Sequence, residues 1–412
     1  MGIRTKLNPM GGKGESTGES LLPMFYSGLN GNTSCYVTEN GYLYMSGRND
    51  EHQQGSGNTT RVYTFTQRAS NVKDVVCSQT TTWYITTSGD LYGCGSNNTI
   101  NESYFTKKAS NVVKVACSND TTWYITTSGD LYGCGRNDYG QQGSGNTTNV
   151  TTFTKRASNV KDVVCTSYST WYIDKNDNLY GCGSNQSYQQ GNGGSGTYVS
   201  SFTQKPSNVA KVVLGDGNSP EQEAVWILKT NGDLSGCGYN GQGQQGNGNT
   251  NNVANFSLRA SNVKDVVCWR SSTYYLSENG GIYATGSNYG GCLGLGDTTN
   301  RNSFTLIPNT NNKNIKAMFA GLASFGFIED NGNFYMCGYN TFGQQSTGDT
   351  SNVKSLIQKA YNVKSIFLTE LTSWYIDENN TLYGCGDGTF GEQGNGSGGT
   401  VYLFENKTNY LT

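Results

Sequence analysis

The sequence contains few of the residues on which enzymes and metal sites most often depend. Among its 412 residues there is one histidine, His52, and charged residues make up only 14% of the total. A single histidine excludes a multi-histidine metal site, and it allows a Ser-His-Asp triad only if His52 belongs to it. The net charge of −2 provides no basic surface for a phosphate backbone, so nucleic acid is excluded as the main partner. We expect no enzyme activity, no cofactor and no bound metal.

Long apolar runs are also missing. No window approaches 18 consecutive apolar residues, so we expect no insertion into a membrane. Residues 1–16 lack the apolar segment of a secretory signal, so we expect synthesis in a cytoplasm. The 56 glycines would suit a disordered chain, but aromatic residues make up 12% of the sequence and recur at regular spacing.

An internal repeat runs along the whole chain, with the pattern aromatic-Tyr-Ile-x-x-x-Gly-x-Leu-Tyr-Gly-Cys-Gly. Twelve residues before its last glycine stands a position that is aromatic in six of the eight copies. The copies follow one another at intervals of 40 to 55 residues, which is the length of a propeller blade. The last glycines of the eight copies are Gly47, Gly95, Gly135, Gly183, Gly238, Gly286, Gly338 and Gly386.

Each repeat predicts a four-stranded antiparallel sheet, with strands A to D in chain order. Residues 81–87 are rich in β-branched and aromatic types, Ser88-Gly89-Asp90 suits a tight turn, and 91–95 returns as the next strand. A strand precedes this hairpin and another follows it. Stacking such sheets radially buries both faces of each one. We therefore predict an all-β fold, a closed β-propeller of eight blades over residues 22–412, with seven blades as the fallback and a linear solenoid as the alternative.

The segment Gly290–Asp297 (GGCLGLGD) and the repeated Gly-Gln-Gln-Gly resemble the regulator of chromosome condensation repeat. The resemblance covers about residues 22–412 and implies a propeller; the best-known family member would imply a nucleotide-exchange regulator. Two departures are present. The family usually has seven blades, and it commonly carries His-Thr and Trp-Gly where this chain has Thr-Trp-Tyr and Cys-Gly. No signature of exchange activity can be carried over to individual residues.

The spacing of the twelve cysteines argues against disulfides and zinc, because no Cys-x-x-Cys pair is present. Ten of them occupy two repeat positions, so equivalent cysteines lie about a blade-width apart, beyond the ~7 Å Cα separation of a disulfide. Strand B separates the two sets within a blade. We expect twelve free thiols in a reducing cytoplasm. The sets are Cys94, Cys134, Cys182, Cys237, Cys337 and Cys385, and Cys77, Cys117, Cys165 and Cys268.

The repeats differ most in the A–B loops of units four to six, which share one face of the predicted disc with the C–D loops. Unit five inserts about six residues, unit six carries an off-repeat Trp and Arg, and unit four carries an extra Tyr. These residue types dominate protein interfaces, so we predict a ligand or partner site here. Drift in an unconstrained loop is the alternative. The predicted site residues are Tyr168, Asp216, Glu221, Glu223, Trp269 and Arg270.

Residues 1–21 lack the repeat and are rich in glycine, so we expect a flexible arm that docks on a larger assembly. Its apolar residues would anchor in a groove of the partner. The predicted anchors are Leu7, Met10, Leu21 and Leu22.

The function predicted from these features is a binding or structural propeller, specifically a bacteriophage virion component made in the host cytoplasm. A fibre or decoration protein would hold other virion proteins through the arm and bind a cell-surface glycan or protein. Asn, Lys and Tyr are favoured over Pro and His, as in AT-rich genomes, and residues 81–95 and 121–135 are identical, which indicates recent duplication. The alternative is a protein-binding propeller or nucleotide-exchange-type regulator of the bacterial cytoplasm.

Overall fold

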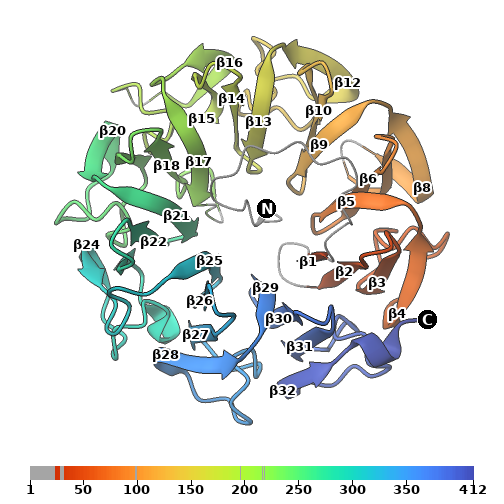
Figure 1. Cartoon of the computed structure of the whole chain (residues 1–412). Coiled ribbons are helices and arrows are strands. Elements are labelled where there is room, and N and C mark those ends of the chain that lie inside the picture. Colours follow the sequence, from red (N-terminus) through yellow and green to blue (C-terminus); the bar gives the residue numbers. More distant parts are fainter. Residues whose placement is uncertain (1–23, 28–31, 98–99, 195, 216, 218) are drawn as a thin grey trace.

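The computed structural model describes residues 24–27, 32–97, 100–194, 196–215, 217 and 219–412. In this part of the chain, eight four-stranded sheets stand in a closed ring around a central axis (Figure 1). Each sheet consists of four consecutive antiparallel strands, and we number these blades 1 to 8 in chain order. Strand A of each blade lies nearest the axis and strand D forms the rim.

Blades 1 to 4 consist of β1 (Met24–Ser27), β2 (Thr33–Val37), β3 (Leu43–Gly47) and β4 (Val62–Ala69); β5 (Val72–Cys77), β6 (Thr81–Thr86), β7 (Leu91–Ser96) and β8 (Asn101–Ala109); β9 (Val112–Cys117), β10 (Thr121–Thr126), β11 (Leu131–Gly135) and β12 (Val150–Ala157); and β13 (Val160–Cys165), β14 (Ser169–Asp174), β15 (Leu179–Ser184) and β16 (Tyr198–Gln204).

Blades 5 to 8 consist of β17 (Val209–Gly215), β18 (Ala224–Lys229), β19 (Leu234–Gly238) and β20 (Val253–Ala260); β21 (Val263–Trp269), β22 (Ser272–Ser277), β23 (Ile282–Gly286) and β24 (Arg301–Leu306); β25 (Ile315–Gly321), β26 (Ser324–Glu329), β27 (Phe334–Gly338) and β28 (Val353–Ala360); and β29 (Val363–Leu368), β30 (Thr372–Asp377), β31 (Leu382–Gly386) and β32 (Val401–Asn406). The described helices are two 3-10 turns, η1 (Tyr289–Gly291) and η2 (Thr408–Tyr410).

The prediction of an all-β propeller with eight blades is therefore confirmed, and the seven-bladed fallback is wrong. The fixed inner block of the repeat is the B–C hairpin, as in β6 and β7, where Thr81 pairs with Gly95 and Ile85 with Leu91. Gly89 closes this hairpin at φ +85°, a left-handed conformation that glycine adopts without strain. The constant spacing thus reflects a two-strand register that the turn determines.

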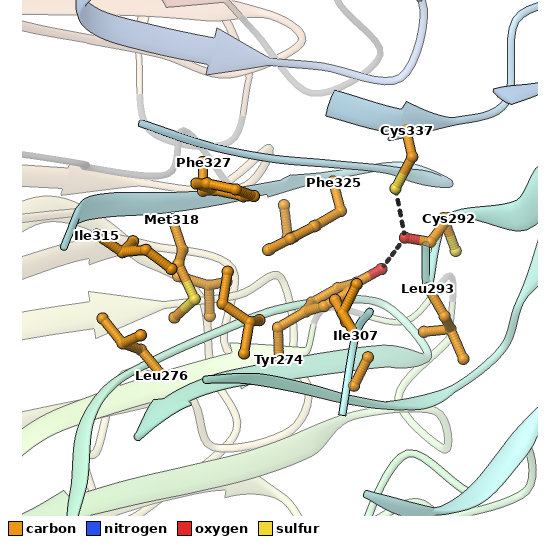
Figure 2. Packing of buried hydrophobic residues seen from close by; sticks show 14 of the residues in the cluster. Tyr274, Leu276, Cys292, Leu293, Ile307, Ile315, Met318, Phe325, Phe327 and Cys337 are labelled. Carbon is orange, nitrogen blue, oxygen red and sulfur yellow. Dashed lines mark hydrogen bonds between the residues drawn. The ribbon is translucent and has the colours of Figure 1, made fainter. Parts of the chain in front are cut away.

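The hydrophobic core lies between blades rather than within them. Figure 2 shows the boundary of blades 6 and 7, where Tyr274 of β22 stacks on Phe325 of β26 with ring centroids 4.1 Å apart. The Tyr274 hydroxyl donates a hydrogen bond to the Cys292 carbonyl at 2.8 Å, and the Cys337 thiol donates to the same oxygen at 3.4 Å. Each blade therefore depends on its neighbour to bury its faces, which favours a closed ring.

The first and last blades meet through side chains and a short backbone pairing. Phe25 of blade 1 stacks on Trp374 of blade 8 with centroids 4.2 Å apart, and the Tyr36 hydroxyl donates to the Asn380 carbonyl at 3.0 Å. At the rim, the Thr412 N–H donates to Phe65 O, and the Gln67 N–H donates to Thr412 O, both at 2.8 Å. The end of the chain thus extends the sheet of blade 1 at its outer edge.

A Gln-Gln pair in the C–D loop fastens blades 1, 3, 4 and 7 to the blade that follows. The second glutamine binds its own strand C, as when Gln142 Nε2 donates to Cys134 O at 2.9 Å. The first glutamine reaches the A–B loop of the following blade. Its Nε2 donates to a backbone carbonyl in four junctions: Gln53 to Gln79 O, Gln141 to Ser167 O, Gln189 to Pro220 O, and Gln344 to Glu370 O.

All twelve cysteines are buried thiols in the structure. The predicted separation concerned the two repeated sets, and a contact lies outside it: the Sγ atoms of Cys35 and Cys77 are 3.5 Å apart. Cys35 belongs to neither repeated set. It occupies the position that holds Trp in blade 2, and this position packs on strand A of the next blade.

Candidate binding face

The A–B and C–D loops form one face of the disc, as predicted, and we call it the loop face. The first residue of a C–D loop donates its N–H to the last residue of the A–B loop of the same blade. Tyr239 N donates to Glu223 O at 2.9 Å, and Tyr339 N donates to Ala323 O at 2.7 Å. These bonds hold the two kinds of loop side by side, so residues on them share one surface.

The insertion of blade 5 folds over blade 4. The Pro220 carbonyl accepts a hydrogen bond from Ser184 Oγ at 3.1 Å, and the Glu221 carbonyl accepts one from Ser187 Oγ at 2.6 Å. The side chain of Glu221 is exposed to solvent. Asp216 lies outside the described residues. The described part of the insertion is therefore docked on the neighbouring blade and presents Glu221 on the loop face.

Glu223 is not available to a ligand, contrary to the prediction. Its side chain is fully buried, and its carboxylate Oε1 accepts hydrogen bonds from Thr166 Oγ1 at 2.6 Å and Ser169 Oγ at 2.8 Å. Both hydroxyls belong to blade 4. Glu223 does lie in the A–B loop, directly before β18, but its side chain points into the protein and anchors the insertion to blade 4.

Trp269 and Arg270 lie at the A–B turn of blade 6. Trp269 is the last residue of β21 and packs partly buried against the core between blades 6 and 7. Arg270 adopts φ +46°, as the two-residue turn demands, and its guanidinium lies 3.7 Å from the carboxylate of Glu370 in blade 8. A ligand carboxylate would compete with Glu370 for this arginine. The Arg270 backbone abuts the start of the insertion, because a Cβ on Gly215 would lie 2.7 Å from Arg270 O.

Tyr168 is partly exposed on the loop face but faces blade 3. Its ring meets that of Tyr139 edge to face at 5.7 Å, and Arg136 lies over Tyr139 at 5.7 Å from the centroid. The structure thus places Arg270 beside the start of the insertion, Glu221 over blade 4, Trp269 toward blade 7, and Tyr168 against blade 3. The predicted anchors Leu7, Met10, Leu21 and Leu22 lie outside the described residues.

A second aromatic group on the loop face escaped the sequence analysis. Tyr289 of blade 6 is 62% exposed, and its ring lies 5.2 Å from that of Tyr339 in blade 7, which in turn lies 6.4 Å from Phe342. Tyr289 stands at the loop position directly after an asparagine that recurs in the repeats. The same position holds Thr341 in blade 7 and Asp138 in blade 3, so a comparison of the C–D loops would have found this exposed tyrosine.

Glu392 of blade 8 stands where five other blades have the first glutamine of the C–D loop. It is fully buried, and the Phe390 N–H donates to its Oε2 at 2.7 Å. Burial raises the pKa of Glu392 to about 8, with the charge of Asp387 adding to the effect, while backbone N–H groups and Arg61 oppose it. The carboxyl is therefore largely protonated at neutral pH, and in that form it carries an O–H that can donate a hydrogen bond, as the glutamine amide does.

The seven A strands from β5 to β29 line a central cavity of about 170 Å³. Its wall pairs charges across blade boundaries: Lys114 with Asp162, and Lys211 with Asp265 at 2.7 Å. In the described parts of the chain, no group of three or more His, Cys, Asp or Glu side chains is arranged to hold a metal ion. None of the helices described there is long and apolar enough to cross a membrane.

Comparison with known proteins identifies the repeat. Residues 112–141 match the model of the regulator of chromosome condensation (RCC1) repeat. The chain is 35% identical over 132 residues to the human X-linked retinitis pigmentosa GTPase regulator, and 34% identical over 123 residues to human protein RCC2. These matches cover 31% and 29% of this chain, but only 13% and 23% of the relatives' lengths.

Two solved structures share the fold at low sequence identity. Human WBSCR16 matches with a TM-score of 0.59 and 16% identity, over 73% of this chain and 83% of that one. Yeast RCC1 (Prp20), from its complex with Kap60, matches with a TM-score of 0.58 and 15% identity, over 71% and 74%. Together with the eight-bladed ring and the repeat match, these similarities show that the chain is a β-propeller of the regulator of chromosome condensation (RCC1) repeat type.

Proposed function

We propose that the chain is a non-enzymatic propeller that binds a protein partner on its loop face. The observation that carries this proposal is that the loops of neighbouring blades expose off-repeat residues on this face: Glu221 in the insertion of blade 5, and Trp269 and Arg270 at the A–B turn of blade 6, beside the start of that insertion. Trp and Arg are the residues that most often dominate binding energy at interfaces. The surrounding blades hold these side chains on a rigid frame, so little conformational entropy is lost when a partner binds.

The structural role of His52, which is the single histidine of the sequence, supports the proposal that the chain is not an enzyme. The residue lies in the C–D loop of blade 1 at φ +60°, and its Nδ1 is 3.2 Å from Asn58 O. This contact helps to close the loop, beside Asn49, whose Nδ2 donates to the same Asn58 carbonyl at 2.8 Å.

At finer detail, we propose a bacteriophage virion component, a fibre or decoration protein made in the host cytoplasm. The arm of residues 1–21 would hold other virion proteins, and the loop face would bind a protein or glycan on the host cell. The support is the composition typical of AT-rich genomes, the recent duplication of one blade, and a Gly-rich arm joined to one rigid disc.

Sedimentation of virus particles tests this role. Particles from infected cells are separated on a density gradient, and the chain is located with an antibody. We expect it to co-sediment with capsid and to be lost from particles when residues 1–21 are deleted, while the melting temperature of the propeller stays within about 2 °C. Recovery of the full chain only in the soluble cell fraction would rule out the virion role.

The second candidate is a protein-binding regulator of the bacterial cytoplasm. The relatives favour it, since one is named a GTPase regulator and one yeast structure is described with binding to Gsp1p and histones. A purified small GTPase loaded with a fluorescent nucleotide would then release it faster when the chain is added. An unchanged release rate would contradict this alternative.

A further inference from the structure

Cys35 and Cys77 face each other across the boundary between blades 1 and 2. Cys35 lies on β2 and Cys77 on β5, and their Sγ atoms are 3.5 Å apart with the Cys35 thiol donating to the Cys77 sulfur. Both side chains are fully buried within one apolar cluster that also contains Met45 and Val75. The contact therefore joins two separate sheets.

A substitution in the repeat creates this contact. In blade 2 the position equivalent to Cys35 holds Trp83, whose ring packs in one cluster with Val115 and Cys117 of blade 3. In blade 1 the small thiol replaces the indole and brings a second sulfur to the strand A cysteine of the next blade. Met45 fills the space that the missing indole would take, at the position where blade 2 has Gly93.

Other cysteines of the repeat have different partners. Cys94, Cys182 and Cys237 each donate to a backbone carbonyl of the preceding blade at 3.4 Å, namely Gln53 O, Gln141 O and Gln189 O. These contacts place an oxygen, not a second sulfur, beside each thiol.

We propose that Cys35 and Cys77 are an oxidation site at which a small-molecule disulfide, such as oxidised glutathione, forms a cross-link between blades 1 and 2. In the first step the thiolate of one cysteine attacks the small disulfide, forming a mixed disulfide and releasing one glutathione thiolate. The second cysteine, after losing its proton to solvent, attacks the mixed disulfide and releases the second glutathione. Two thiols become one disulfide, and the small disulfide is reduced to two thiols.

Burial sets the conditions for this reaction. The contact with Cys35 and desolvation both raise the pKa of Cys77, so thiolate is scarce while the interface is closed. The first step requires transient opening of blade 1 from blade 2, whereas the second occurs within the pair. Once formed, the disulfide links two cysteines that are 42 positions apart in the sequence. Because both sulfurs are buried, reductants in solution reach the disulfide poorly. The cross-link requires neither a partner nor the role proposed above.

Incubation of the purified full chain with oxidised glutathione, a few degrees below its melting transition, tests the assignment. The expected product has two fewer free thiols than the reduced chain and a mass lower by two hydrogen atoms. After alkylation and digestion without a reductant, mass spectrometry should find a disulfide-linked pair of peptides that contain Cys35 and Cys77. The oxidised chain should melt a few degrees higher than the reduced one. Glutathione adducts on separate cysteines, a disulfide between other residues, or an unchanged chain would each overturn the assignment.

Two matched variants separate this pair from general thiol reactivity. Cys35→Ser should form no intramolecular disulfide under the same conditions. Cys94→Ser removes another fully buried thiol, one that donates to a carbonyl, and should still lose two thiols to the cross-link. Equal oxidation of the two variants would show that the contact between Cys35 and Cys77 does not direct the chemistry.

Discussion

Trp83 and Gly93 are cross-strand partners in the B–C hairpin of blade 2, and the indole occupies the space where a side chain at position 93 would begin. A Cβ on Gly93 would lie 2.5 Å from the ring of Trp83. The same fit recurs where a tryptophan occupies this position, as with Trp123 and Gly133. Where the aromatic residue is absent, the partner is larger: Gly326 pairs with Met336. The large residue of the pair thus lies on strand B in one blade and on strand C in another.

This fit predicts that Gly93→Ala destabilises the propeller. The added methyl group must displace a fully buried indole, and overpacking of this kind costs about 1–3 kcal/mol. Thermal melting followed by circular dichroism measures the loss. Gly194→Ala is the matched control, because a Cβ there meets no atom within 4 Å, and its melting temperature should stay close to that of the wild type. Equal melting of the two variants would contradict the packing argument.

The raised pKa of Glu392 predicts that the stability of the boundary between blades 8 and 1 depends on pH. Its pKa in the folded chain is about 8, above the usual 4.5, so the folded state holds the proton more tightly. The stabilisation is fully present below pH 4.5 and is lost as pH rises to 8, by at most about 1.4 kcal/mol per pH unit. Glu392→Gln keeps a donor at every pH and should melt higher than the wild type at pH 8, with little difference at pH 4.5.

The reverse exchange in blade 7 provides the control for Glu392. Gln344 is fully buried and donates to Glu370 O at 3.3 Å, so Gln344→Glu should introduce a similar loss of melting temperature between pH 4.5 and 8. Melting curves at pH 4.5, 6 and 8 compare the three proteins, and groups common to all of them cancel in the differences. Parallel pH profiles for all three would show that these carboxyls do not titrate as described.

Trp269 and Arg270 should differ in their effect on folding although both serve the proposed binding patch. Arg270→Ala removes a partly exposed ion pair and should cost less than about 1 kcal/mol. Trp269→Ala removes packing against the core of blades 6 and 7 and should cost about 2 kcal/mol, while Trp269→Phe keeps much of that contact. Both Ala variants should weaken attachment of the purified chain to host cells at least tenfold, as measured by flow cytometry. Unchanged attachment by Arg270→Ala would remove this residue from the site.

The hydrogen bonds of Glu223 to blade 4 predict that its substitution loosens the insertion of blade 5. Glu223→Ala leaves the hydroxyls of Thr166 and Ser169 without their acceptor in a buried site, which costs about 1–3 kcal/mol. The loop should also become sensitive to proteolysis near Glu221, since its anchor to blade 4 is lost. Glu223→Gln retains an acceptor oxygen and should be cut more slowly. Identical cleavage of both variants and the wild type would show that the loop is held by its backbone contacts alone.

The candidate site was predictable in its location and less so in its chemistry. The insertion of blade 5 and the off-repeat Trp269 stand out in a comparison of repeats, and alternating strands place their loops on one face. Arg270 and Glu370 are a hundred residues apart and belong to blades 6 and 8, so their ion pair follows only from closure of the ring. Burial of Glu223 depends likewise on contact with a different blade, which no local pattern records.

The sequence by itself determined the number of blades, the order of strands and the register of each hairpin, because these depend on local spacing, turn residues and strand propensity. The tertiary structure decided what each repeated position does. Cys35 and Trp83 occupy the same place in the repeat, yet one meets a second sulfur and the other fills the space above a glycine. Such outcomes depend on side chains from neighbouring blades, and the volumes and charges that meet there are decided only when the ring closes.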